Sequence, residues 1–140
     1  MSWTWTLAFH PPCSLQHGQQ IIGLAESILV AAGFELTPVA DAHLCCGSAG
    51  TYSILQPELA QKLKAQKLAS LHAGSPQEIV SANIACLGHL QSGTELPLRH
   101  WIVALDKRLS ALILRAFGSR HSMDAWKGAP ILVLRLVNGI

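Results

Sequence analysis

The chain has 140 residues, of which 50% are hydrophobic and 13% are charged, and its formal net charge is +2. These values exclude a disordered chain, which needs low hydrophobicity and high net charge, and the lack of basic runs argues against a nucleic-acid surface. The apolar runs are far shorter than the ~20 residues of a membrane helix, and the N-terminus lacks the basic start of a secretion signal, so we expect a cytoplasmic domain.

Strand and helix signals alternate along the first part of the chain. Residues 5–9 are aromatic and β-favouring and stop before two prolines, which predicts a strand. Apolar residues at helical spacing predict a helix over 18–32, with Gly33 as its C-terminal stop. Residues 34–39 form the second predicted strand, and a loop containing Cys45-Cys46-Gly47-Ser48-Ala49-Gly50 follows it.

The same alternation continues in the second part of the chain. A helix is predicted to start near Pro57, and one of its faces carries a set of leucines: Leu55, Leu59, Leu63 and Leu71. Its lysines lie off that stripe and are interpreted as solvated: Lys62, Lys64 and Lys67. A strand over 79–82, a short helix to Gln91, an extended piece over 96–98 and a helix over 101–109 complete the pattern, with His100 and Trp101 packing at the start of that last helix.

The alternation predicts an α/β fold with a small parallel sheet and flanking helices. In open parallel sheets, ligands gather beyond the carboxyl ends of the strands. Cys13 follows the first predicted strand, Cys45 and Cys46 follow the second, and Cys86 follows the third. We therefore expect the four thiols in loops at the C-terminal strand edge, within reach of one metal centre.

Two regions differ in charge and pattern. Residues 1–110 carry the alternating pattern and are predicted to form the domain. Residues 111–140 are predicted to form a divergent tail, because they show little periodicity and hold four basic residues against one acidic residue.

The cysteines themselves allow more than one interpretation. Intracellular thiols stay reduced, so clustered cysteines indicate metal binding or catalysis rather than disulfides. Buried, inert cysteine is the alternative, because free Cys is among the most buried residue types. Gly47 and Gly50 would let the backbone approach a bound cluster without an intervening Cβ, and loop amides could donate to its sulfides. A tight glycine turn around a buried thiol pair is the alternative for this loop.

Several histidines lie close to the cysteines in sequence. His10, His17 and His43 could donate to cluster sulfurs or carry protons near neutral pH, or they could instead bond to loop carbonyls. His89, three residues after Cys86, is either a further ligand or a surface residue.

Two strings carry a family resemblance. They are His10-Pro-Pro-Cys13-Ser-Leu-Gln-His17-Gly and His43-Leu-Cys45-Cys46-Gly47-Ser-Ala-Gly50-Thr-Tyr52. With Asn83-Ile-Ala-Cys86 downstream, they resemble the cysteine-rich CCG domain, and within that family the C-terminal part of the bacterial glycolate oxidase iron-sulfur subunits. The resemblance covers about residues 6–109.

The resemblance implies an iron-sulfur cluster of the 4Fe-4S type bound at this edge. Its implied ligands are four thiolates: Cys13, Cys45, Cys46 and Cys86. The implied neighbours of the cluster are Gly47, Gly50, His10, His17 and His43. Many CCG domains end in Cys-x-x-Cys, and in the heterodisulfide reductase B subunit such cysteines hold non-cubane 4Fe-4S clusters. Here Cys86-Leu-Gly-His89 departs from that pattern, so a cubane cluster, an incomplete cluster and tetrahedral Zn²⁺ stay open.

The resemblance also implies a role in an oxidoreductase complex. In such a complex, flavin-containing subunits oxidise glycolate to glyoxylate, and iron-sulfur subunits pass electrons onward. The chain would then be cytoplasmic, with peripheral association to the inner membrane through the complex as an option. The 140 residues contain neither a ferredoxin-type Cys-x-x-Cys-x-x-Cys nor a dinucleotide-binding Gly-x-Gly-x-x-Gly, so we expect no catalysis by the chain alone.

Two other function classes compete with electron transfer. The first is a structural zinc-binding interaction domain without redox activity. The second is a thiol catalyst with Cys13 as its nucleophile, helped by His10 or His17. The thiol catalyst leaves the other three cysteines without a role.

Overall fold

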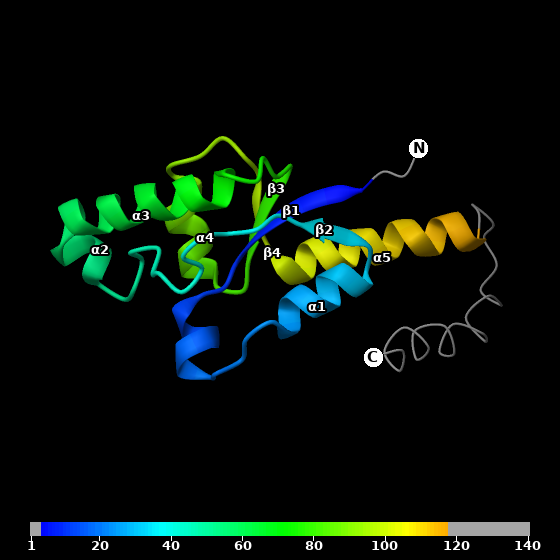
Figure 1. Cartoon of the computed structure of the whole chain (residues 1–140), viewed down its shortest axis with the longest axis horizontal. Helices are drawn as coiled ribbons and strands as arrows, with labels where there is room; N and C mark the ends of the chain where they lie inside the picture. The colour runs from blue at the N-terminus through cyan, green and yellow to red at the C-terminus, as the bar shows by residue number, and fades with distance from the viewer. Residues whose placement is uncertain (1–3, 118–140) are drawn as a thin grey trace. The chain divides into compact units, whose positions relative to one another are not determined.

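A single parallel sheet organises the protein. The computed structural model describes residues 4–117, and within them four strands alternate with helices (Figure 1). The strands are β1 (Trp5–His10), β2 (Phe34–Leu36), β3 (Glu78–Ser81) and β4 (Leu98–His100). Their order is β2-β1-β3-β4 and every pairing is parallel, which confirms the predicted α/β fold. Strand β2 is shorter than predicted, because Pro38 has no backbone N–H for the sheet.

The chain between β1 and β2 departs from the predicted helix over 18–32. It forms a π-helical turn, η1 (Ser14–Gly18), and then a separate helix, α1 (Leu24–Ala31). Left-handed backbone at Gln20 (φ 56°) and Gly23 (φ 77°) interrupts the helix between them. Gly33 ends the segment as predicted, with φ 87° directly after the C-cap of α1.

Helices cover both faces of the sheet (Figure 1). Since successive side chains of a strand point to opposite faces, β1 divides between two cores. Leu7 and Phe9 pack with residues of α1 and with Ala104. On the other face, Ala8 and Ile79 pack with residues of α3 (Pro57–His72) and α4 (Ile84–Gln91), namely Leu68, Leu71 and Leu90. A short helix, α2 (Tyr52–Leu55), precedes α3.

Helix α3 buries a different face from the predicted one. Leu55 and Leu59 are exposed, and the buried positions are Ala60, Lys64, Lys67, Leu68 and Leu71. The prediction that Lys64 and Lys67 are solvated was therefore wrong, whereas Lys62 is exposed as expected. Lys67 is four residues from Leu71 and so shares its face of the helix.

Each buried lysine is tolerated because its amine finds an oxygen. Lys64 Nζ donates to Ser92 Oγ on the residue that caps α4, at 2.8 Å. Lys67 Nζ donates to backbone carbonyls in the loop that carries Cys45 and Cys46. A lysine amine can be buried only where another segment supplies an oxygen for it. The helical spacing of residues in the sequence does not show where such an oxygen lies.

The last described helix is longer than predicted. Helix α5 (Trp101–Phe117) begins at Trp101, which packs as expected, against the core that holds Leu7 and Phe9. The expected boundary between residues 110 and 111 falls within this helix, and the chain separates into compact units over Met1–Leu105 and Asp106–Ile140. Most of the predicted tail lies outside the described residues, so its separate character stays a prediction. Among the described residues, no helix has the length and apolar character to cross a membrane.

Two leucines of α3 test the observed helix face. Leu71 is 0% exposed and Leu59 is 46% exposed. We expect Leu71→Ala to lower the free energy of unfolding by about 2–5 kcal/mol, because it leaves a cavity in the core. Leu59→Ala should lower it by less than about 1 kcal/mol. Urea unfolding followed by circular dichroism measures both, and equal losses would instead support the leucine face predicted from the sequence.

Candidate metal centre

The last residues of β1 and β3 form the floor of the site. The pleat places His10 on the same sheet face as Ala8, and Ser81 on the same face as Ile79. The register pairs His10 with Ser81, and Ser81 Oγ lies 2.9 Å from His10 Nδ1. The other ring nitrogen of His10, Nε2, is buried and makes no regular hydrogen bond within residues 4–117. Sequence reasoning missed Ser81, whose role depends on strand register.

Two buried thiols meet this histidine. Ligand atoms of His10, Cys46 and Cys86 all lie within 4.8 Å of one another. Cys46 comes from the loop between β2 and α2. The sequence predicted Cys86 in a loop, but it lies in the first turn of α4. The Asn83 side chain caps that helix and accepts hydrogen bonds from Ala85 N (2.8 Å) and Cys86 N (3.3 Å).

The other two cysteines lie beside this group and are partly exposed. Cys13 immediately precedes η1, and Cys45 directly precedes Cys46 in the cysteine loop; neither belongs to the group of three ligand atoms within 4.8 Å. The segments that follow β1, β2 and β3 therefore bring all four cysteines to the carboxyl edge of the sheet, as their positions after the strands predicted.

Further donors in the cysteine loop face the sulfurs. Gly47 N donates to Cys45 Sγ at 3.3 Å. Ser48 Oγ lies 3.1 Å from Cys46 Sγ and donates to Cys86 Sγ at 3.5 Å. Donors of this kind stabilise thiolates and tune metal–sulfur centres. Ser48 was not singled out from the sequence, where its only signal was its place inside the loop string.

The two loop glycines have different surroundings. Gly47 has φ +90°, and a Cβ there would lie 2.7 Å from the carbonyl oxygen of Ala60 on α3. Gly50 has φ +50° with nothing within 4 Å of the added Cβ. Gly47 therefore lets the loop backbone approach α3, whereas Gly50 is favoured only by its left-handed conformation.

The thiols influence one another's protonation. Burial raises the pKa of Cys13 to about 11, and the neighbouring Cys45 and Cys46 add to this rise. The hydrogen bond between Cys46 and Cys86 lowers the pKa of Cys46 and raises the pKa of Cys86, because the remaining S–H donates to the first thiolate. His10 and Ser48 also favour the Cys46 thiolate. Loss of the first proton is therefore favoured at Cys46, and the thiolate is the form in which sulfur binds metals.

The remaining histidines lie outside the group of three. His17 Nε2 donates to the backbone carbonyl of His43 at 3.2 Å, and both residues are exposed. This contact ties η1 to the cysteine loop. His89 follows Cys86 by three residues on α4, and its Nε2 is buried with no hydrogen-bond partner in the described part of the chain.

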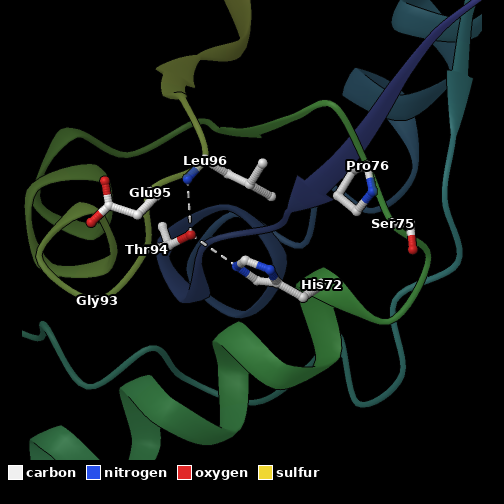
Figure 2. A pocket seen from close by; sticks show the side chains of 7 residues that line it. All are labelled: His72, Ser75, Pro76, Gly93, Thr94, Glu95 and Leu96. Atoms are coloured by element: carbon white, nitrogen blue, oxygen red, sulfur yellow. Dashed lines mark hydrogen bonds between the residues drawn. The ribbon is translucent and has the colours of Figure 1, made fainter.

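A pocket at the opposite edge of the sheet has different chemistry (Figure 2). It has a volume of about 600 Å³, and its lining comes from the end of α3 and the segments before β3 and β4. His72 Nε2 lies 2.9 Å from Thr94 Oγ1, which also accepts from Leu96 N. His72 and Thr94 therefore serve each other in this pocket, which lies away from the cysteines.

Comparison with known proteins agrees with the cysteine arrangement. The model of the cysteine-rich domain family CCG matches residues 7–91, which hold all four cysteines. The chain belongs to this family. The match covers the strands β1–β3 and the helices up to α4, so the CCG domain and the described site coincide.

The chain is similar to part of several longer curated proteins. The glycolate oxidase iron-sulfur subunit of Escherichia coli (strain K12) is 50% identical over 103 residues, which are 74% of this chain and 25% of that protein. The probable glycolate oxidase iron-sulfur subunit of Bacillus subtilis is 38% identical over 63 residues, 45% of this chain and 14% of that one. Lactate utilization protein A of Shouchella clausii is 25% identical over 81 residues, which cover 54% of this chain and 34% of that protein. The chain spans about a quarter of the length of the Escherichia coli relative.

The two glycines provide a matched test of the loop. Gly47→Ala should lower the free energy of unfolding by roughly 2–3 kcal/mol, because strained backbone and a clash with α3 coincide there. Gly50→Ala should cost about 1 kcal/mol from backbone conformation alone. Urea unfolding of the metal-free protein gives both values. A cost for Gly50→Ala equal to or above that for Gly47→Ala would contradict the packing of Gly47 on α3.

Proposed function

We propose that this CCG domain binds an iron-sulfur cluster through Cys13, Cys45, Cys46 and Cys86 and serves as an electron-transfer part of a glycolate oxidase-type oxidoreductase. The observation that supports this most is the group of His10, Cys46 and Cys86, whose ligand atoms lie within 4.8 Å of one another at the carboxyl edge of the sheet. Cys13 and Cys45 lie on segments that leave β1 and β2 at the same edge. Thiolates are the usual ligands of iron-sulfur clusters. The similarity to glycolate oxidase iron-sulfur subunits supports the oxidoreductase role.

The residues present fit such a group. They supply four soft sulfur ligands, a buried imidazole nitrogen without a regular partner, and amide and hydroxyl donors to the sulfurs. When bound, a cluster of this kind supplies one-electron transfer. A 4Fe-4S cluster is the type we propose, because the resemblance to CCG domains implies it and four thiolates fit its ligand set.

The protein's own residues orient and shield the centre in this proposal. Gly47 N and Ser48 Oγ donate to ligating sulfurs, and Ser81 fixes the His10 ring. If Ser81 donates to Nδ1, the His10 proton is on Nε2 and is directed to the thiolates. Gly50, His17 and His43 shape and hold the cysteine loop at the outer side of the site.

We further propose that the electron donor is a flavin-containing subunit that oxidises glycolate to glyoxylate. An iron-sulfur centre accepts single electrons, so it suits the step that follows the flavin. Peripheral association with the inner membrane would then come from the complex.

A zinc-binding interaction domain is the second candidate. The specific observation that favours it is the compact group of His10, Cys46 and Cys86, because mixed imidazole and thiolate ligands are typical of tetrahedral zinc. Cys45 or Cys13 would complete the coordination.

Metal analysis separates the two candidates. We expect anaerobically purified or reconstituted protein to contain iron and acid-labile sulfide in similar amounts, with visible absorption and an electron paramagnetic resonance signal after reduction. Cys46→Ser should lose most of the iron. His10→Ala should bind the metal at least about tenfold more weakly than the wild type. His72→Ala, at the opposite sheet edge, is the matched control and should keep the cluster. Colourless protein that contains zinc and no sulfide would contradict the iron-sulfur proposal.

The isolated chain should not oxidise glycolate. The reaction needs a two-electron acceptor beside the substrate carbon, and the sequence has no Gly-x-Gly-x-x-Gly dinucleotide motif. Reduction of an artificial dye by the purified chain, with and without an added flavoprotein that oxidises glycolate, measures this. Turnover by the chain alone would show that the domain is catalytic.

A further inference from the structure

Lys67 is a buried cation that points away from solvent. The residue is 2% exposed, and its Nζ donates to the carbonyl oxygens of Asp41 (3.2 Å) and Ala42 (2.8 Å). Both carbonyls belong to the loop that continues to Cys45 and Cys46. Lysine is rarely buried to this extent unless its charge is compensated, because removing an ammonium from water is costly.

The compensating negative charges come from the cysteines and from Asp41 in the cysteine loop. Within residues 4–117, the ion pair that the structure records joins Arg99 to Glu78 and does not involve Lys67. Desolvation lowers the pKa of Lys67, and negative charge on the thiolates of Cys13, Cys46 and Cys45 and on the carboxylate of Asp41 opposes that shift. The ammonium lies against the loop that leads to Cys45 and Cys46, and deprotonated sulfurs at this edge of the sheet add negative charge near it.

The carbonyl of Ala42 also accepts a hydrogen bond from a second side chain. Gln16 Nε2 donates to the carbonyl oxygens of Ala42 (3.2 Å) and Pro11 (3.0 Å). Ala42 is thus held from α3 by Lys67 and from η1 by Gln16, which follows Cys13. The segments that carry three of the four cysteines are joined at this carbonyl, and Lys67 supplies the only formal positive charge among its donors in the described chain.

We propose that Lys67 is a positioning residue that holds the Cys45–Cys46 loop and raises the reduction potential of the centre bound there. The inference rests on the proposed iron-sulfur function. A cluster with thiolate ligands gains one negative charge on reduction, and a nearby buried cation stabilises the more negative state. Removing the cation should make the centre harder to reduce.

Lys64 provides a matched control for this inference. It lies one helical turn earlier on α3, is also buried, and donates to Ser92 instead of the cysteine loop. The full chain is prepared anaerobically as wild type, Lys67→Met, Lys67→Gln, Lys67→Arg and Lys64→Met. At a fixed applied potential, Lys67→Met and Lys67→Gln should lower the ratio of reduced to oxidised cluster about tenfold, or about 59 mV for a one-electron couple. Lys67→Arg and Lys64→Met should keep the wild-type ratio.

The outcomes separate this inference from the proposed function. If the wild type binds no iron-sulfur cluster, both fail. If the wild type binds a cluster, and the ratio of reduced to oxidised cluster is unchanged in Lys67→Met or Lys67→Gln, only the Lys67 inference fails. Loss of the cluster in both neutral variants, with retention in Lys67→Arg and Lys64→Met, would support the positioning role. Equal cluster loss in Lys64→Met or in Lys67→Arg would overturn it, and the melting temperatures of the metal-free proteins show whether general destabilisation is the cause.

Discussion

Parallel pairing of β1 with β2 and β3 is the constraint on which the site depends. Parallel strands end at a common edge and need long connections, so the segments that leave them start side by side. Cys13, the Cys45–Cys46 pair and Cys86 occupy these three segments. A sheet of mixed direction would have sent at least one of them to the other edge, where the His72 pocket lies.

The pleat and the register add the groups that surround the thiols. Alternation along β1 and β3 directs His10 and Ser81 to the face covered by α3 and α4, the same face on which Cys46 and Cys86 are buried. The cysteine loop has no regular secondary structure between β2 and α2, so its carbonyls need partners outside the backbone ladder. Gln16, His17 and Lys67 provide them.

Several of these contacts stabilise negative charge on the cysteine sulfurs. Burial raises the pKa of Cys13, and the charges of Cys45 and Cys46 add to the rise because deprotonated thiols at one edge repel one another. Hydrogen-bond donors at Gly47 and Ser48, the neighbouring His10 ring and the cation of Lys67 offset that repulsion. These groups stabilise negative charge on the sulfurs.

The sequence by itself determined the alternation of strands and helices, the edge at which the cysteines meet and the family, because short β-favouring runs, proline and glycine stops and the cysteine strings are local signals. It did not determine the break before α1 or the full length of α5, where several backbone conformations compete. Only the tertiary structure decided that Lys64 and Lys67 are buried, that Gly47 packs on α3, and that His10 meets Ser81. Each of these depends on an atom supplied by a distant segment: a loop carbonyl, a helix backbone or a neighbouring strand in register. Helical periodicity reports which residues share a face, but it does not report whether that face meets an oxygen or a hydrocarbon.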